Sequence, residues 1–116
     1  MNLYVSKAKL KNIDAPNKDF YTNIAVQKAN INPKAKITHV MYRWNYRNSP
    51  NNISVELCHS SGYCIDTTKS RERMANEFSG LNPSEPFYFL VRVLGDKNFH
   101  PLVGEEAEIN VNFYEP

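Results

Sequence analysis

The sequence predicts an all-β fold, an antiparallel β-sandwich or partly open barrel of about seven to eight strands. Apolar and polar residues alternate in several runs, and breakers rich in Asn, Pro and Gly separate these runs at short intervals. The two cysteines of the chain lie in one such run, six positions apart, as expected for a disulfide-stapled hairpin. At 116 residues, the chain supports one sandwich domain spanning residues 1–116.

Residues 38–47 show the clearest alternation, with aliphatic and aromatic side chains at even positions. A period of two with one apolar face predicts a half-buried strand. Its expected inward residues are Val40, Tyr42, Trp44 and Tyr46, and its expected outward residues are Arg43, Asn45 and Arg47.

Four other segments complete the predicted strands. Residues 107–113 repeat the alternation, and residues 87–94 are apolar on both faces, which indicates a central strand. Residues 3–10 and 20–26 are two further candidates, and a turn is expected over residues 95–98. Residues 70–78 are the exception, because they fit either a short helix capped by Ser70, with Met74 and Phe78 on one side, or an irregular loop.

Residues 55–66 read as a hairpin with the three-residue loop 60–62, in which Gly62 takes the left-handed conformation. This register places Cys58 opposite Cys64, near disulfide reach, with the cysteine face pointing outward. A bridge would place the protein in an oxidising compartment; a reduced pair is the alternative. The spacing is longer than that of zinc or redox cysteine pairs, so we expect no metal site.

The bulk composition indicates a soluble protein without a membrane span, since mean hydropathy is −0.56 and no long apolar run occurs. The first residues lack the apolar core of an export signal. A disulfide-bonded protein nevertheless needs a route out of the cytosol. We therefore expect Met1 to stand in place of a removed signal and the chain to be the mature form.

Charge is unevenly distributed along the chain. Residues 1–50 hold nine Lys and Arg against two Asp (net +7), whereas residues 51–116 hold five against ten acids (net −5). Either strands from the two halves interleave and mix the charges, or a basic face meets an anionic partner. Arg43 and Arg47 are the candidate partner-binding residues in the second case, and surface pairing with acids of the second half is the alternative. A net charge of +2 without a recognisable module argues against nucleic acid.

Motifs for catalysis or cofactor binding are absent from the sequence: there is no Gly-rich phosphate loop, no nucleophile elbow and no His-Glu-x-x-His. We therefore expect no enzyme and no cofactor. The aromatic stripe Tyr42, Trp44 and Tyr46 has two interpretations, core packing or a stacking platform for sugars, and the second would suit a carbohydrate- or cell-wall-binding module.

Residues 37–114 resemble FlhE, a family of periplasmic accessory proteins of bacterial flagella. Four features carry the resemblance by their order and spacing: the aromatic-basic strand 42–46, the cysteine hairpin 55–65, Glu85-Pro86-Phe87-Tyr88-Phe89 entering an apolar strand, and Pro101-Leu102 followed by the terminal strand 109–114. Residues 67–80 depart from the family by being longer and more charged.

The resemblance implies a small all-β periplasmic protein that serves flagellar assembly and secretion as an accessory or chaperone factor, not as an enzyme. Such proteins are associated with limiting proton leak through the export apparatus. The expected partners are flagellar export or rod proteins. The family supplies no catalytic residues, and only Cys58 and Cys64 carry over, in a structural role. The oligomeric state stays open, with a homodimer as one option.

Overall fold

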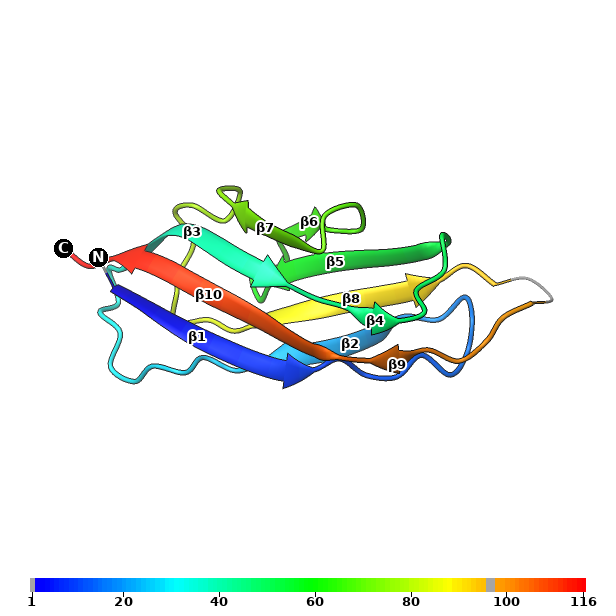
Figure 1. Cartoon of the computed structure of the whole chain (residues 1–116). Helices are drawn as coiled ribbons and strands as arrows, with labels where there is room; N and C mark the ends of the chain where they lie inside the picture. The colour runs from blue at the N-terminus through cyan, green and yellow to red at the C-terminus, as the bar shows by residue number, and fades with distance from the viewer. Residues whose placement is uncertain (1, 96–97) are drawn as a thin grey trace.

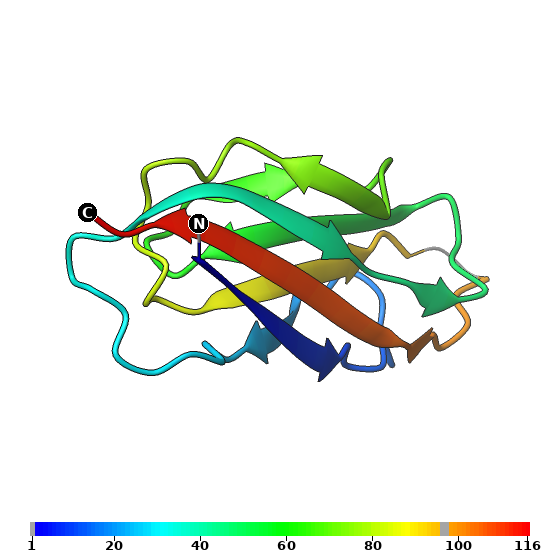
Figure 2. The ribbon, with the colours of Figure 1, turned by 60° about the vertical axis from the view of Figure 1, so that its left-hand side comes forward.

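A computed structural model describes residues 2–95 and 98–116. Met1 and positions 96 and 97 of the predicted turn lie outside the described residues. The molecule is elongated, with principal extents of 53 × 21 × 20 Å, and its described residues form ten strands in an all-β sandwich. Figures 1 and 2 show two layers of antiparallel strands packed face to face.

The first sheet has the order β1-β10-β3-β7, and the second has the order β2-β8-β5-β6. The strands of the first sheet are β1 (Asn2–Lys9), β10 (Glu106–Tyr114), β3 (Lys36–Arg43) and β7 (Glu72–Ala75). Those of the second are β2 (Phe20–Ile24), β8 (Phe87–Val93), β5 (Ile53–His59) and β6 (Cys64–Asp66). The short strands β4 (Tyr46–Arg47) and β9 (Val103–Gly104) pair separately. All these adjacent strands are antiparallel, as the alternation predicts.

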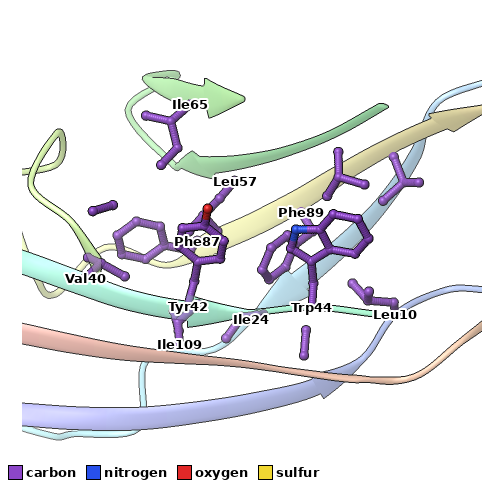
Figure 3. Packing of buried hydrophobic residues seen from close by; sticks show 14 of the residues in the cluster. Leu10, Ile24, Val40, Tyr42, Trp44, Leu57, Ile65, Phe87, Phe89 and Ile109 are labelled. Atoms are coloured by element: carbon purple, nitrogen blue, oxygen red, sulfur yellow. The ribbon is translucent and has the colours of Figure 1, made fainter. Parts of the chain in front are cut away.

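The inward side chains of both sheets meet in one hydrophobic core (Figure 3). The even positions of residues 40–46 all lie in it, as do Ile109, Val111 and Phe113 of β10. Strand β8 is central in its sheet, between β2 and β5, as its apolar sequence predicts. A core made of alternating positions from both sheets defines a β-sandwich.

The cysteine hairpin has the predicted register. Cys58 pairs with Cys64 across β5 and β6 and forms a disulfide with it, and Gly62 closes the loop with φ of +97°. One part of the prediction is wrong: Cys58 lies on the outer face of its sheet, as the register requires, but it is fully buried and does not reach solvent. Its cross-strand neighbours on that face are Tyr88 of β8 and Cys64 of β6, which flank it on both sides.

Two element predictions differ from the structure. Residues 72–75 form strand β7 at the edge of the first sheet, and so are neither the short helix nor the irregular loop that the sequence suggests; Met74 is exposed while Phe78 is buried. The predicted strand 38–47 is interrupted at Trp44 and Asn45. Its first part is β3 of the first sheet, and its last part is β4, which belongs to the separate sheet with β9. The inward alternation survives this break, so the sequence pattern does not reveal it.

No helix in residues 2–95 and 98–116 is long and apolar enough to cross a bilayer.

Candidate functional site on the outer face of the first sheet

The outer face of the first sheet carries side chains in ordered rows across its strands, and Figure 1 views the molecule from this side. Strand register defines each row, because paired positions of antiparallel strands lie side by side on one face. The apolar row consists of Val5, Asn110, Met41 and Met74, and the charged row consists of Lys7, Glu108, Arg43 and Glu72. We call these eight residues the outer face.

The apolar side chains of this row are more exposed to solvent than is usual for valine and methionine. Val5 is 40% exposed, and Met41 and Met74 are each 49% exposed. The adjacent residue of β1 on the same face, Leu3, is 50% exposed. Apolar side chains gathered on one sheet face and rimmed by charges are typical of a protein-binding surface.

The charged row alternates in sign across the four strands. Lys7 Nζ lies 3.7 Å from Glu108 Oε1, and Arg43 Nη2 lies 3.3 Å from the same oxygen. Arg43 also lies 3.7 Å from Glu106 Oε1, one step further along β10. These are solvent-facing pairs, so each contributes under about 1 kcal/mol to folding. Their alternation leaves the row with both signs available to a partner.

Two shallow hollows mark this face. The first, of about 180 Å³, lies over the middle of both rows between β10 and β7. The second, of about 290 Å³, lies at the break between β3 and β4. There the Asn45 amide donates to Glu105 Oε2 at 3.0 Å and accepts from Arg71 Nη1 at 2.6 Å. Arg43 and Glu72 line both hollows, which are therefore adjacent along β3.

The structure separates the two predicted partner-binding arginines. Arg43 is in the outer face and pairs with Glu106 and Glu108, as the pairing alternative expects. Arg47 lies beyond the strand break on β4, opposite Val103, in a different sheet. The interpretation that both arginines share one face of a continuous strand is therefore wrong, because the chain leaves the first sheet at Trp44. Whether either arginine binds a partner stays a prediction.

The aromatic stripe belongs to the core. Tyr42, Trp44 and Tyr46 are 1–2% exposed. Their polar atoms donate to backbone carbonyls: Tyr42 to Ser70, Trp44 to Thr67, and Tyr46 to Lys11. A sugar stacks on an exposed ring face, so the interpretation of these residues as a ligand platform is wrong.

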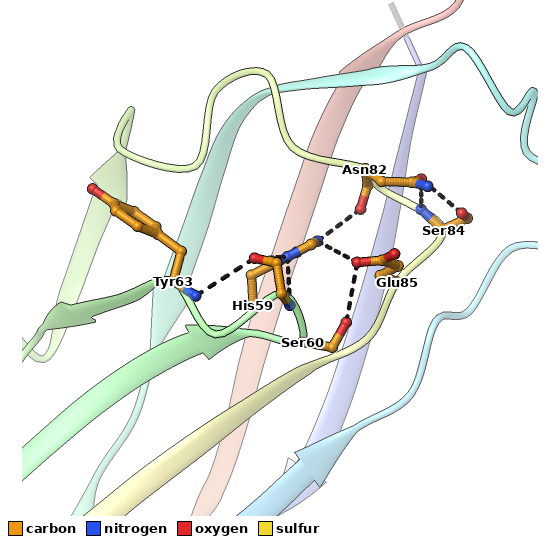
Figure 4. A network of polar contacts seen from close by, with 7 residues as sticks. His59, Ser60, Tyr63, Asn82, Ser84 and Glu85 are labelled. Carbon is orange, nitrogen blue, oxygen red and sulfur yellow. Dashed lines mark hydrogen bonds and ion pairs between the residues drawn. The ribbon is translucent and has the colours of Figure 1, made fainter.

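A polar network surrounds His59, which is 1% exposed (Figure 4). Its Nε2 lies 2.9 Å from the Asn82 carbonyl oxygen, and its Nδ1 accepts from the Ser61 backbone N–H at 3.1 Å and lies 2.8 Å from Ser61 Oγ. Glu85 lies 3.8 Å from Nε2. Both ring nitrogens are thus held by the backbone, which ties the hairpin loop to residues 82–85. The arrangement is that of a structural clamp.

Local contacts shift the pKa values of Arg73, Glu77 and Asp66, which lie outside this network. The Arg73–Glu77 ion pair at 3.0 Å raises the pKa of Arg73 and lowers the pKa of Glu77. Hydrogen bonds from Thr68 lower the pKa of Asp66. No group of three His, Cys, Asp or Glu side chains suited to a metal occurs in the part of the chain that the structure describes.

Sequence reasoning does not find the apolar row, because it places Met41 only in a strand and Met74 only in a candidate helix. The available signal is the position of Met41 on the odd, polar side of its alternating run. The row itself arises from register between strands far apart in sequence.

The fold and its bridged hairpin define the class: a single antiparallel β-sandwich with one disulfide. Within that class, the chain has the fold of FlhE. A crystal structure described as that of FlhE superposes with a TM-score of 0.84 over 98% of this chain and 97% of that chain, at 16% identity. The resemblance predicted from sequence is therefore confirmed at the level of fold.

Other likenesses are partial. A crystal structure of a serine protease of Aeromonas sobria matches 96% of this chain with a TM-score of 0.67 and 12% identity. A second, of that protease with the chaperone ORF2, matches with a TM-score of 0.65 and 11% identity. This chain spans 27% of each matched chain. No family model matches the sequence, and no curated protein matches it.

Proposed function

We propose that this protein is a non-enzymatic periplasmic accessory protein of the bacterial flagellar export and assembly system. The observation that carries the proposal is the end-to-end fold likeness to FlhE, which leaves almost none of either chain unmatched. The Cys58–Cys64 disulfide supports the compartment, because structural disulfides persist in oxidising surroundings such as the periplasm.

The protein works by binding other proteins, and its outer face is the proposed binding surface. The apolar row supplies area whose burial favours association, at roughly 25 cal/mol per Å². The charged row alternates in sign and so favours partners with a matching pattern. Flagellar export or rod proteins are the proposed partners, and limited proton leak or mis-assembly is the proposed consequence of binding.

The absence of an enzymatic role is part of the proposal. The cluster that most resembles a catalytic site is His59 with Ser61 and Glu85, and its geometry supports a non-enzymatic role. General-base catalysis needs an imidazole nitrogen within reach of a substrate, whereas the His59 ring is buried and both of its nitrogens contact the backbone.

Deletion of the gene in its host tests the proposal. We expect altered flagellar number or motility and a cytoplasm that acidifies faster in an acidic medium, all restored by the gene supplied on a plasmid. The matched control is the same plasmid carrying a stop codon early in the gene. Wild-type flagella, motility and cytoplasmic pH in the deletion strain would remove the proposal.

A further inference from the structure

The charged row of the outer face has a symmetry that bears on its partner. From β1 to β7 its signs run plus, minus, plus, minus: Lys7, Glu108, Arg43, Glu72. A row of four charges with strictly alternating signs is complementary to the same row in reverse order. Read backwards, each position carries the opposite charge.

A two-fold axis performs this reversal. For two copies packed face to face, the two-fold axis lies in the plane of the interface. We place it parallel to the strands and midway between β10 and β3. Each row of one copy then faces the same row of the second copy. Strand β1 then lies over β7 of the second copy, and β10 lies over β3 of the second copy. Lys7 meets Glu72 of the second copy, and Glu108 meets Arg43 of the second copy, each pair occurring twice as symmetry requires.

The same rotation places the apolar row, with its one polar member Asn110, over the apolar row of the second copy. Val5 lies over Met74 of the second copy, and Met41 lies over Asn110 of the second copy. All three apolar side chains are at least 40% exposed in the single chain, so each loses water contact on packing. The strands of the two copies then run in line, which falls within the aligned class of sheet packing, where mean strand directions agree to within about 30°.

We infer that the outer face binds a second copy of this chain, forming a symmetric face-to-face dimer. The inference rests on the proposal that the protein acts through this face, and it names the partner that the free protein finds there. Pairing within the sheet accounts for the Lys7–Glu108 and Arg43–Glu108 contacts. The same alternation makes the row complementary to a second copy of itself, which fixes the one register that we infer.

The size of the outer face determines how tightly two copies are expected to associate. The eight residues of the outer face, four strands wide and four residue steps long, cover roughly 19 by 13 Å, or about 250 Å² a side. Specific interfaces commonly bury about 800 Å² a side, so this dimer belongs to the weak, transient class. Association is therefore expected at micromolar concentrations or above, and high salt should weaken it.

A charge swap in purified protein tests the inference by sedimentation equilibrium across a hundredfold range reaching high micromolar concentrations. Lys7→Glu alone and Glu72→Lys alone each place like charges across the interface twice. Each should raise the dimer Kd about tenfold or more, since an exposed pair is worth up to about a factor of five. The double variant Lys7→Glu with Glu72→Lys should restore the wild-type Kd.

The swap separates contacts between copies from contacts within one chain. Lys7 and Glu72 are three strand spacings apart, roughly 14 Å, so they do not compensate for each other in a monomer. Within one chain, the double variant instead puts a carboxylate at position 7 beside Glu108 and an ammonium group at position 72 beside Arg43. Lys28→Glu, in the exposed segment after β2, changes net charge equally to Lys7→Glu and should leave the Kd unchanged.

A cysteine pair gives a second readout that needs no restored charge. Lys7→Cys protein mixed with Glu72→Cys protein should form a covalent heterodimer with a short bismaleimide crosslinker, which spans the sheet spacing of about 10 Å, while a mixture of Lys7→Cys and Lys28→Cys should not. A monomer at every concentration would overturn the inference, and so would a double variant that associates more weakly than both single variants. If the dimer is absent but outer-face variants still fail to support flagella, the inference falls and the proposed function stands.

Discussion

Individual side chains in this sandwich show what burial does to polar groups. Trp44 and Tyr46 are almost fully buried and direct their N–H and O–H groups to carbonyl oxygens. Tyr4 is the contrast: it is 4% exposed, packs beside Phe113, and its hydroxyl has no hydrogen-bond partner among the described residues. An unpaired buried hydroxyl costs about 1–3 kcal/mol.

Tyr4→Phe should therefore leave the free energy of unfolding unchanged or raise it by about 1 kcal/mol at pH 7, because it removes only the unpaired hydroxyl. Urea unfolding measures this change. The matched control is Tyr46→Phe, which strands the Lys11 carbonyl and should lower stability by about 1 kcal/mol. A Tyr4→Phe protein less stable than wild type by more than that amount would show that the hydroxyl has a partner.

The same residue makes stability depend on alkaline pH. Burial raises the pKa of Tyr4 to about 12, above its ordinary value of 10.0. A folded-state pKa above the unfolded value means that stability is fully present below pH 10 and lost as pH rises toward 12. The advantage of Tyr4→Phe over wild type should thus grow between pH 10 and pH 12. A constant difference across this range would contradict the assigned burial.

At the scale of elements, the hairpin shows local sequence setting local structure. Gly62 has the positive φ that its loop needs, and its N–H donates to the His59 carbonyl at 2.9 Å. The loop brings Cys58 opposite Cys64. The bridge closes a short loop, so the chain-entropy model gives it about 2 kcal/mol.

Replacing both cysteines by alanine should lower the free energy of unfolding by about 2 kcal/mol without abolishing the fold, since Leu57 and Ile65 still bury their side chains. Alanine avoids placing a hydroxyl at the fully buried position 58. Thermal unfolding with and without reductant is the measurement: wild type should respond to reductant and the double variant should not. Equal melting temperatures for wild type under both conditions would argue against a stabilising bridge.

Elements are predictable from sequence where period two coincides with burial, as in β3 and β10, and where both faces are apolar, as in β8. The prediction of elements fails where the spacing of apolar residues does not reflect how the strands pair. Alternation runs unbroken through Trp44 although the chain changes sheets there. Met74 and Phe78 are four apart, which suggests a helix, yet pairing with β3 makes residues 72–75 a strand. Strands of two residues, such as β9, are too short to leave a pattern.

At the scale of the whole molecule, chain topology redistributes the charge of the sequence. The first sheet alternates strands from the two halves: β1, β10, β3 and β7. In this sheet the basic strands β1 and β3 alternate with strands of the acidic second half, and the interleaving interpretation is confirmed by the Lys7–Glu108 and Arg43–Glu108 pairs. Composition reveals the asymmetry, but only the register turns it into a face with alternating signs.

The claim that the protein supports flagella by binding through its outer face is tested most directly by complementation of the deletion strain with Met41→Lys and Met74→Glu together. These residues are paired across β3 and β7, so the two new charges attract each other and the fold should keep its melting temperature. The control is Tyr21→Glu, which changes a residue of similar exposure on the second sheet. We predict that the double variant is folded, accumulates normally and fails to restore motility and cytoplasmic pH, while Tyr21→Glu restores both. Full restoration by the double variant would contradict the claim.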